Sequence, residues 1–210
     1  TPRSQMNTSQ MMDTSQNPRF GRRIRRWMAS CDYQDVRYFT ESVAEAGLAD
    51  QNRRKKNVGD AVRLAAARIY NRLARELIGE FAWVVEDDVI PPNDAAENLL
   101  IAFDENTATV AGPYRSRFHD GYVAWRSGRN VITKRGAGVE AIEGNGFGCT
   151  MFRAEALRNA LFTCRQPPFV DFDPAFYERL KSTGLKVRLC WDAESEHLET
   201  DPRTIMVWDH

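Results

Sequence analysis

The strongest constraint on this chain is the stretch from Phe81 to Pro92, which reads Phe-Ala-Trp-Val-Val-Glu-Asp-Asp-Val-Ile-Pro-Pro. Five consecutive apolar residues are typical of a strand buried on both faces, as in a sheet with helices on each side. Two prolines cannot continue a central strand, so the strand must end before them. The acids that follow it therefore lie at its carboxyl end, where open α/β sheets bind their ligands.

The adjacent carboxylates of Glu86, Asp87 and Asp88 repel one another, and burying them unpaired is costly. A divalent cation relieves both problems, because Mg²⁺ and Mn²⁺ prefer oxygen ligands and Mg²⁺ usually binds one or two carboxylates together with substrate phosphates. A solvated acidic turn after a core strand explains the same residues without a metal. The stretch alone leaves both interpretations open.

The composition is that of an ordinary globular protein, and 210 residues suffice for one domain with a sizeable core. The 29 basic residues balance 29 acidic ones, so the net charge gives no argument for binding nucleic acid or a membrane. The sequence contains no signal peptide and no apolar run long enough to span a bilayer. Scattered cysteines without a CxxC pair indicate reduced thiols and a cytoplasmic protein; they are Cys31, Cys149, Cys164 and Cys190.

Helical and strand patterns alternate through the middle of the chain. Apolar residues recur at helical spacing over 58–78, and the acidic strand follows at once. A second helix is predicted over 93–103, with Ala96, Leu99, Leu100 and Phe103 facing inward, and a buried strand over 107–111. This alternation predicts an α/β fold with a mostly parallel sheet, and a hairpin over 121–133 makes that sheet mixed.

The later elements are shorter. A strand over 139–143 leads into Gly144-Asn145-Gly146-Phe147-Gly148. A helix is predicted over 174–183, a strand over 186–190, and a polar loop then carries His197.

Taken in this order, the elements from about residue 11 to about residue 200 resemble a glycosyltransferase of the GT-A fold, closest to the family 2-like group. The resemblance implies one Rossmann-like domain over 1–210, with a mixed, mostly parallel sheet flanked by helices. It also implies transfer of a sugar, with inversion, from a UDP- or GDP-sugar to a hydroxyl of a glycan or other acceptor. Mn²⁺ or Mg²⁺ would be the cofactor, because the departing diphosphate needs its charge neutralised.

The family's Asp-x-Asp signature is matched by Glu86-Asp87-Asp88, with glutamate in the first position. By resemblance, Asp88 would bind the metal and Glu86 would support the ribose or the water shell of the metal. His197 matches the family's late histidine, which completes the metal shell, and imidazole suits manganese. A surface histidine in a polar loop is the simpler explanation of His197 taken alone.

Two acids precede the helix over 174–183. In inverting members of the family, an acid here takes the proton from the acceptor hydroxyl. Asp173 stands directly before Pro174, which is a favoured helix-capping pattern, so we expect Asp171 to be the base and Asp173 the cap. The family's usual Glu-Asp pair is replaced here by Asp-Phe-Asp, which leaves the assignment open.

The glycines of the 144–148 segment let the backbone approach a ligand closely, and Phe147 would stack on a sugar. A tight turn between two strands explains the same segment. Trp191 would line the acceptor site or belong to the core. The expected donor- and acceptor-binding residues are therefore Asp13, Glu86, Asp87, Asn145, Gly146, Phe147 and Trp191.

Residues 1–19 are polar, and we expect them to be loosely ordered. Asp13 resembles the end of the family's second strand, where an aspartate contacts the nucleotide base. Nothing before Met11 matches the family's apolar first strand. We therefore expect a truncated or divergent amino terminus and an incomplete donor pocket.

Two other functions fit the same residues. A two-metal phosphoryl-transfer enzyme or nuclease would use Glu86, Asp88, Asp171, Asp173 and His197. The near-neutral charge and the lack of a basic stripe with aromatics count against nucleic acid. A truncated, non-catalytic domain that binds a glycan or a partner is the second alternative.

Overall fold

The structure is a computed structural model, and it describes residues 8–13, 22, 35–40, 56–86, 89–116, 119–162 and 172–197. Its contacts divide the chain into two compact units. The first unit comprises Thr1–Ala82 and Arg153–Phe176, and the second comprises Trp83–Phe152 and Tyr177–His210. The single domain expected over 1–210 stays a prediction.

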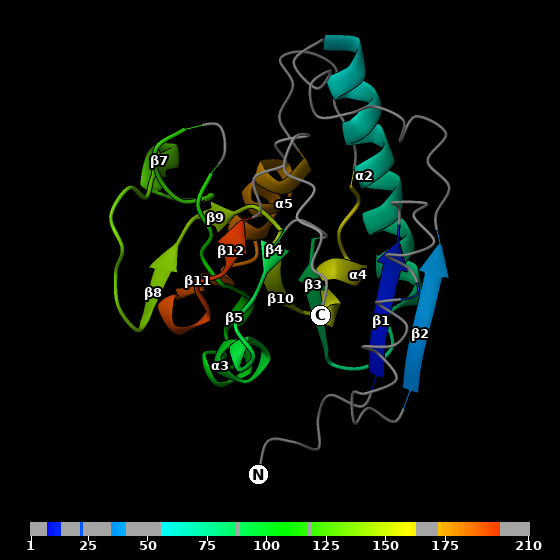
Figure 1. Cartoon of the computed structure of the whole chain (residues 1–210), viewed down its shortest axis with the longest axis horizontal. Coiled ribbons are helices and arrows are strands. Elements are labelled where there is room, and N and C mark those ends of the chain that lie inside the picture. Colours follow the sequence, from blue (N-terminus) through cyan, green and yellow to red (C-terminus); the bar gives the residue numbers. More distant parts are fainter. Residues whose placement is uncertain are drawn as a thin grey trace. The chain divides into compact units, whose positions relative to one another are not determined.

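A two-stranded parallel sheet belongs to the first unit. Strand β1 (Thr8–Asp13) pairs with β2 (Asp35–Thr40), so that Asp13 lies opposite Thr40 (Figure 1). The strand end expected at Asp13 is thus present. β1 occupies part of the stretch for which we expected loose order, because its polar residues are paired with a neighbouring strand.

Helix α2 (Lys56–Glu76) confirms the helix predicted over 58–78 to within two residues at each end. It packs against the short helix α4 (Ala154–Arg158) of the same unit. The Asn71 side chain joins α2 to the chain after α4: its Nδ2 donates to the Phe162 carbonyl at 2.7 Å, and its Oδ1 accepts from the Phe162 N–H at 2.9 Å.

A five-stranded sheet lies almost wholly in the second unit, with the order β3-β10-β5-β11-β8 (Figure 1). The strands are Phe81–Val85, Cys149–Arg153, Thr107–Ala111, Lys186–Cys190 and Val139–Ile142, in that order. β5 is buried throughout, as predicted. β3 is one of the two edge strands of this sheet, and only Ala82 in it is fully buried, so the expectation of a strand buried on both faces is wrong for β3.

The strand directions confirm a mixed sheet but not a mostly parallel one. β5 and β11 are parallel, whereas β10 is antiparallel to β5 and β8 is antiparallel to β11. Backbone bonds from Glu86 N to Gly148 O and from Ala154 N to Glu80 O show that β3 is also antiparallel to β10. β3 and β5 therefore run in the same direction, as the helix between them predicts, but β10 lies between them in the opposite sense.

Helix α3 (Ala95–Ile101) packs against β5, and it buries Ala95 and Leu99. The prediction of Leu99 as inward is confirmed, and its buried partner is Ala95, which lies four residues earlier on the same face; Ala96, Leu100 and Phe103 are only partly buried. Helix α5 (Phe172–Lys181) begins two residues before the predicted start. Pro174 then lies in the first turn, where a backbone N–H has no helical partner to lose.

The predicted hairpin is present in a second, three-stranded sheet, with the order β7-β6-β9. β6 (Ala124–Arg126) and β7 (Asn130–Val131) are antiparallel around the 3₁₀ turn η3 (Ser127–Arg129), and β9 (Gly144–Asn145) pairs with β6. The turn needs Gly128, whose φ of 69° is favourable for glycine.

Two of the four cysteines can be placed. Cys149 and Cys190 are buried free thiols, which confirms the expectation for these two. Burial is the main cause that raises the pKa of both thiols, so both stay protonated at neutral pH. In the described part of the chain, no helix is long and apolar enough to cross a membrane.

Candidate functional site

The carboxyl ends of three strands of the five-stranded sheet lie at one edge, because β3, β5 and β11 run in the same direction. Glu86 follows β3, Gly112 follows β5, and the 3₁₀ turn η4 (Trp191–Ala193) follows β11. The segments that follow β5 and β11 contact each other, because Ser195 N donates to the Pro113 carbonyl at 2.8 Å. The sequence prediction placed the ligand site at this edge.

A two-residue ladder joins the segment after the acidic stretch to the histidine segment. β4 (Val89–Ile90) pairs antiparallel with β12 (Glu196–His197), so that His197 lies opposite Val89 and Glu196 lies opposite Ile90 (Figure 1). Val89 is the residue that follows Asp88 in the chain. The backbone of His197 is thus brought next to the segment that carries the predicted metal ligand.

The ring of His197 is held by two neighbours in the chain after β5. Its Nδ1 lies 2.6 Å from the Arg115 carbonyl oxygen, and its ring meets the Tyr114 ring edge-on, with centroids 5.0 Å apart. A carbonyl can only accept, so Nδ1 carries the proton and the lone pair of the neutral ring lies on Nε2. A histidine held in this way through one nitrogen is typical of metal ligands.

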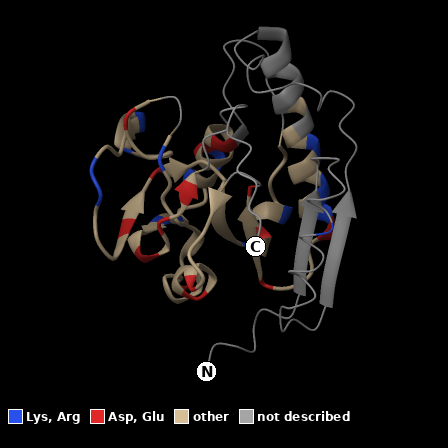
Figure 2. Ribbon diagram, viewed as in Figure 1, with Lys and Arg blue, Asp and Glu red and all other residues tan. Residues whose placement is uncertain are grey.

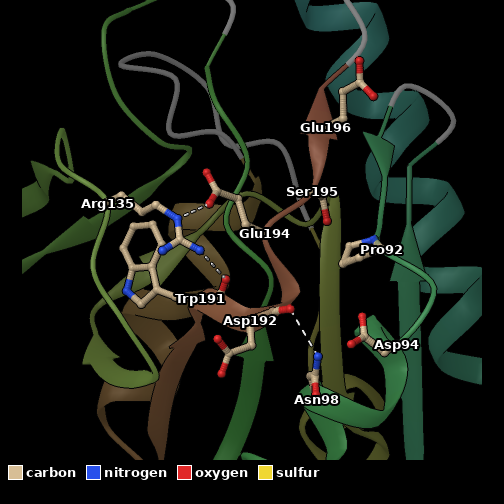
Figure 3. Close-up of a pocket in the computed structure, with 9 residues that line it drawn as sticks. All are labelled: Pro92, Asp94, Asn98, Arg135, Trp191, Asp192, Glu194, Ser195 and Glu196. Atoms are coloured by element: carbon tan, nitrogen blue, oxygen red, sulfur yellow. Dashed lines mark hydrogen bonds and ion pairs between the residues drawn. The ribbon is translucent and has the colours of Figure 1, made fainter.

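A pocket of about 800 Å³ opens next to this ladder, within the second unit. Its wall comes from the chain after β4, from α3, from the loop before β8, and from η4 and β12 (Figure 3). The volume is in the range of small-molecule sites, but this pocket is an open depression and not an enclosed cleft. The lining residues are Pro92, Asp94, Asn98, Arg135, Trp191, Asp192, Glu194, Ser195 and Glu196.

Glu194 is the best-anchored acid of this pocket. One carboxylate oxygen accepts from the buried Tyr122 hydroxyl at 2.9 Å, and the other accepts from Arg135 Nε at 2.6 Å (Figure 3). Burial, and then the bond to Glu194, raise the pKa of Tyr122; the same carboxylate raises the pKa of Arg135. Tyr122 therefore stays protonated and Arg135 stays charged at neutral pH.

In the described part of the chain, the ion pair of Arg135 is with Glu194, and among the other acids of the lining Asp192 is near enough to help raise the pKa of Arg135. Asp94 is at the N-cap position of α3, yet its side chain makes no capping bond. Asp192 receives a bond from Asn98 Nδ2 on its backbone carbonyl at 3.2 Å, not on its carboxylate (Figure 3). Acidic residues are present on α3, η4 and β12 in Figure 2. The lining is therefore predominantly acidic.

The 144–148 segment belongs to the core, which corrects the sugar-binding interpretation. Phe147 is 2% exposed, and its ring packs edge-on against Phe152 and Tyr177. A Cβ at Gly146 or Gly148 would clash with the Tyr114 side chain. The close approach that these glycines permit is to Tyr114 and not to a ligand.

Asn145 is also structural. It is 1% exposed; its Nδ2 donates to the Gly146 carbonyl at 2.6 Å and to Thr150 Oγ1 at 2.7 Å, and its Oδ1 accepts from the Tyr177 hydroxyl at 2.7 Å. This set of partners satisfies the amide from within the protein. The prediction that Asn145 contacts a substrate is therefore not supported.

Trp191 is a core residue, and its role in an acceptor site stays a prediction. It is 1% exposed, its ring lies edge-on to Tyr122 at 4.9 Å, and its Nε1 donates to Glu140 at 2.8 Å. These contacts are those of a core residue. Trp191 nevertheless belongs to the pocket wall, where its carbonyl lies 3.5 Å from Arg135.

The structure describes three of the six remaining predicted site residues. Glu86 is half-buried, and its N–H donates to the Gly148 carbonyl at 2.9 Å. Asp173 lies in the first turn of α5 and not at its cap position, and it belongs to the first unit. Asp13 ends β1, also in the first unit. Asp87, Asp88 and Asp171 lie outside the described residues.

A complete metal site is not formed by the described residues alone: among them, no three His, Cys, Asp or Glu side chains are grouped to hold an ion. His197 meets the requirement of a fixed ring, and Asp88 stays the predicted carboxylate ligand. The sequence reasoning missed Asp94, Arg135, Asp192 and Glu194. The position of Asp192 directly after a strand was the signal that could have identified it.

Comparisons with known proteins bear on the fold. No protein-family model matches the chain, and no curated protein does. Thirty-four chains of solved structures match. One of them is the A197 protein from STIV, with a TM-score of 0.58 and 16% sequence identity over 92% of this chain and 86% of that chain. At this identity the likeness shows a shared fold alone.

Proposed function

We propose that the chain is a metal-dependent glycosyltransferase of the GT-A type, which moves a sugar from a nucleoside diphosphate to an acceptor hydroxyl. The observation that supports this most is the β4–β12 ladder, with His197 opposite Val89. A histidine on another face of the sheet would have removed the basis for a shared cation. The pocket beside the ladder supplies space for a substrate of small-molecule size.

Asp88 and His197 would hold the cation, which would neutralise the charge that develops on the departing diphosphate. The contribution of the described residues is to fix His197: the Arg115 carbonyl sets its tautomer and the Tyr114 ring sets its plane. Tyr114 is itself buried and accepts a bond from Gly148 N at 3.1 Å, so the support is rigid.

The reaction forms a bond between the acceptor oxygen and C1 of the donor sugar, while the bond from C1 to the diphosphate oxygen breaks. The diphosphate keeps the electron pair of that bond. The acceptor proton goes to a general base, for which Asp171 and Asp173 are the proposed candidates. Inversion at C1 follows from a single displacement.

A thermal-shift screen tests this proposal. UDP- and GDP-sugars are added to the chain with and without Mn²⁺. Ligand at about 100 times its dissociation constant stabilises the folded state by about 2.7 kcal/mol, which is several degrees for a chain of this size. We expect stabilisation by a nucleotide-sugar only when Mn²⁺ is present.

Variants of two histidines test whether the Mn²⁺-dependent thermal shift depends on the predicted metal ligands. His197→Ala should abolish the Mn²⁺-dependent shift, as should Asp88→Asn. His119→Ala is the control, because His119 is an exposed histidine of the same unit and bonds only weakly to the Asp120 carbonyl, at 3.4 Å. Stabilisation by Mn²⁺ alone would favour the two-metal phosphoryl-transfer alternative, and no shift under any condition would favour the non-catalytic domain.

A further inference from the structure

Strand β8 forms one edge of the five-stranded sheet (Figure 1). It is hydrogen-bonded to β11 on one side, and among the described residues no strand pairs with its other side along Val139 and Ala141. An unpaired strand edge presents N–H and C=O groups that can bond to another chain. β8 therefore offers a main-chain binding surface within the second unit.

The main-chain groups of β8 alternate in direction, as in any antiparallel pair. Trp191 N donates to the Gly138 carbonyl at 2.8 Å, so every second residue from Gly138 onward turns its main-chain groups toward β11. Val139 and Ala141 therefore turn theirs away from the sheet, where no group in the described part of the chain bonds to them. Glu143 also turns its N–H outward, but there it donates to a carbonyl of β6 at 3.0 Å. The free edge thus consists of Val139 and Ala141.

The side chains at this edge are apolar and exposed. Val139 is 46% exposed, and Ala141 is exposed on the same face of the sheet. β8 contains neither lysine nor proline, which commonly protect edge strands from pairing. Its one charged residue, Glu140, lies on the opposite face and is already bound, since its carboxylate accepts from Trp191 Nε1 at 2.8 Å and from Arg126 Nη2 at 2.7 Å. β8 itself therefore does not oppose pairing with another strand.

We infer that β8 pairs antiparallel with β8 of a second copy of this chain, so that two five-stranded sheets join across a two-fold axis. Val139 of each copy then pairs with Ala141 of the other, and all the outward main-chain groups of both residues are bonded. A register that pairs Ala141 with itself would place Val139 opposite Glu143, whose N–H is already used. A register that pairs Val139 with itself would need Ala137, which lies outside the strand. A two-fold contact of this kind closes on itself and yields a dimer.

The charges favour a copy of the same chain as the partner. The 29 basic and 29 acidic residues balance, so two copies do not repel each other through net charge. Glu140 lies opposite Glu140 of the copy in this register, and each carboxylate brings its own Arg126 to the axis. Arg126 uses Nε and Nη2 for its own Glu140, at 3.2 and 2.7 Å, and its side chain is 52% exposed, so it can also donate to the copy's Glu140. The two ion pairs therefore complement each other across the axis.

Sedimentation equilibrium of the full chain, without metal or nucleotide, tests this inference independently of the proposed function. A contact of two residues in each strand is small, so we expect a dissociation constant between about 10 µM and about 1 mM. The weight-average mass should rise toward twice the chain mass across this range. A chain that is still monomeric at about 1 mM, the weakest affinity expected, would overturn the inference.

Two lysine variants, matched in the residue replaced, test whether β8 makes the contact. Val139→Lys places a charge at the free edge and should weaken self-association at least about tenfold. Val131→Lys is the control, because Val131 is 42% exposed and belongs to β7, an edge strand of the other sheet. This control should dimerise like the parent chain, and circular dichroism checks that both variants are folded. Equal weakening by the two variants, or none by Val139→Lys, would contradict a contact through β8.

Disulfide cross-linking tests the register. The Cα atoms of a hydrogen-bonded antiparallel pair are about 5.5 Å apart, close to the commonest separation in disulfides. Mild oxidation of a mixture of Val139→Cys and Ala141→Cys should therefore link the two variants, and mass spectrometry of the linked peptides identifies the bond. In either variant alone the introduced thiols are diagonal neighbours about 7–8 Å apart at Cα, which is too far for a disulfide. Cross-linking as strong in one variant alone as in the mixture would overturn the register centred on Glu140.

Discussion

Removing the Tyr177 hydroxyl should destabilise the chain without affecting a nucleotide-sugar site. The hydroxyl donates to Asn145 Oδ1 at 2.7 Å, and both residues are 1% exposed. In Tyr177→Phe, the carbonyl oxygen of the Asn145 amide loses this partner in a place that water does not reach. Leaving a buried polar group unsatisfied costs about 1–3 kcal/mol.

The expected loss of about 2 kcal/mol corresponds to a fall in Tm of about 4–8 °C for a chain of this length. Urea denaturation followed by circular dichroism measures the free energy, and the m-value should not change. A double-mutant cycle with Asn145→Ala isolates the pair, and its coupling energy should be about 1–2 kcal/mol.

The same variants decide what Asn145 does. If it holds the 144–148 segment, then Tyr177→Phe and Asn145→Ala lower stability but keep any Mn²⁺-dependent shift by a nucleotide-sugar at a temperature where they are folded. A Tyr177→Phe variant with unchanged stability, together with a coupling energy near zero, would refute the structural role. Loss of the donor shift in folded Asn145→Ala would return Asn145 to the substrate site.

Two further predictions concern the frame of the site. Gly112→Ala should cost about 1–3 kcal/mol in urea denaturation, because the new Cβ would clash with the Ala193 carbonyl of η4 and lie 3.1 Å from Cys149 Sγ; a variant as stable as the parent would show that η4 does not need this close approach. The pKa of Asp104 is held below its ordinary value of 3.8, chiefly by the Thr107 hydroxyl, with help from the Asn106 N–H and from Arg188 and Lys186 against the effect of burial. A lowered pKa contributes stability above pH 3.8 that is lost as the pH falls through the folded value, so Asp104→Asn should lower Tm at neutral pH, and the difference should close in acid; a difference in Tm that does not change with pH would contradict this.

Local sequence patterns were sufficient to predict those helices, strands and turns that depend mainly on residues close together in the chain. The helical spacing of apolar residues located α2, the apolar run located β3, and Ser127-Gly128 located the hairpin turn. The position of β10 was not predictable in this way, because its neighbours in the sheet are set by long-range pairing. The relative directions of the strands were therefore misjudged, although four of the five strands, β3, β5, β8 and β11, were predicted.

In the candidate site too, local patterns predicted some features, whereas features set by long-range contacts were missed. The position of the acids after β3 and the late histidine pointed to one edge of the sheet, and the ladder brings their segments together there. The glycine-rich segment misled us, because glycine signals close approach without saying what approaches. Tyr114 lies more than 30 residues away from Gly146 and Gly148 in the chain, and no local pattern connects them.

The place of β10 has a consequence for synthesis on the ribosome. β3 and β5 are made early, yet the strand that hydrogen-bonds to both of them ends only at Arg153. A nascent chain that stops before that residue exposes a backbone edge on each of the two strands, which invites pairing with other chains. The sheet can close only after β10 has left the exit tunnel, so β3 and β5 wait for β10 during synthesis.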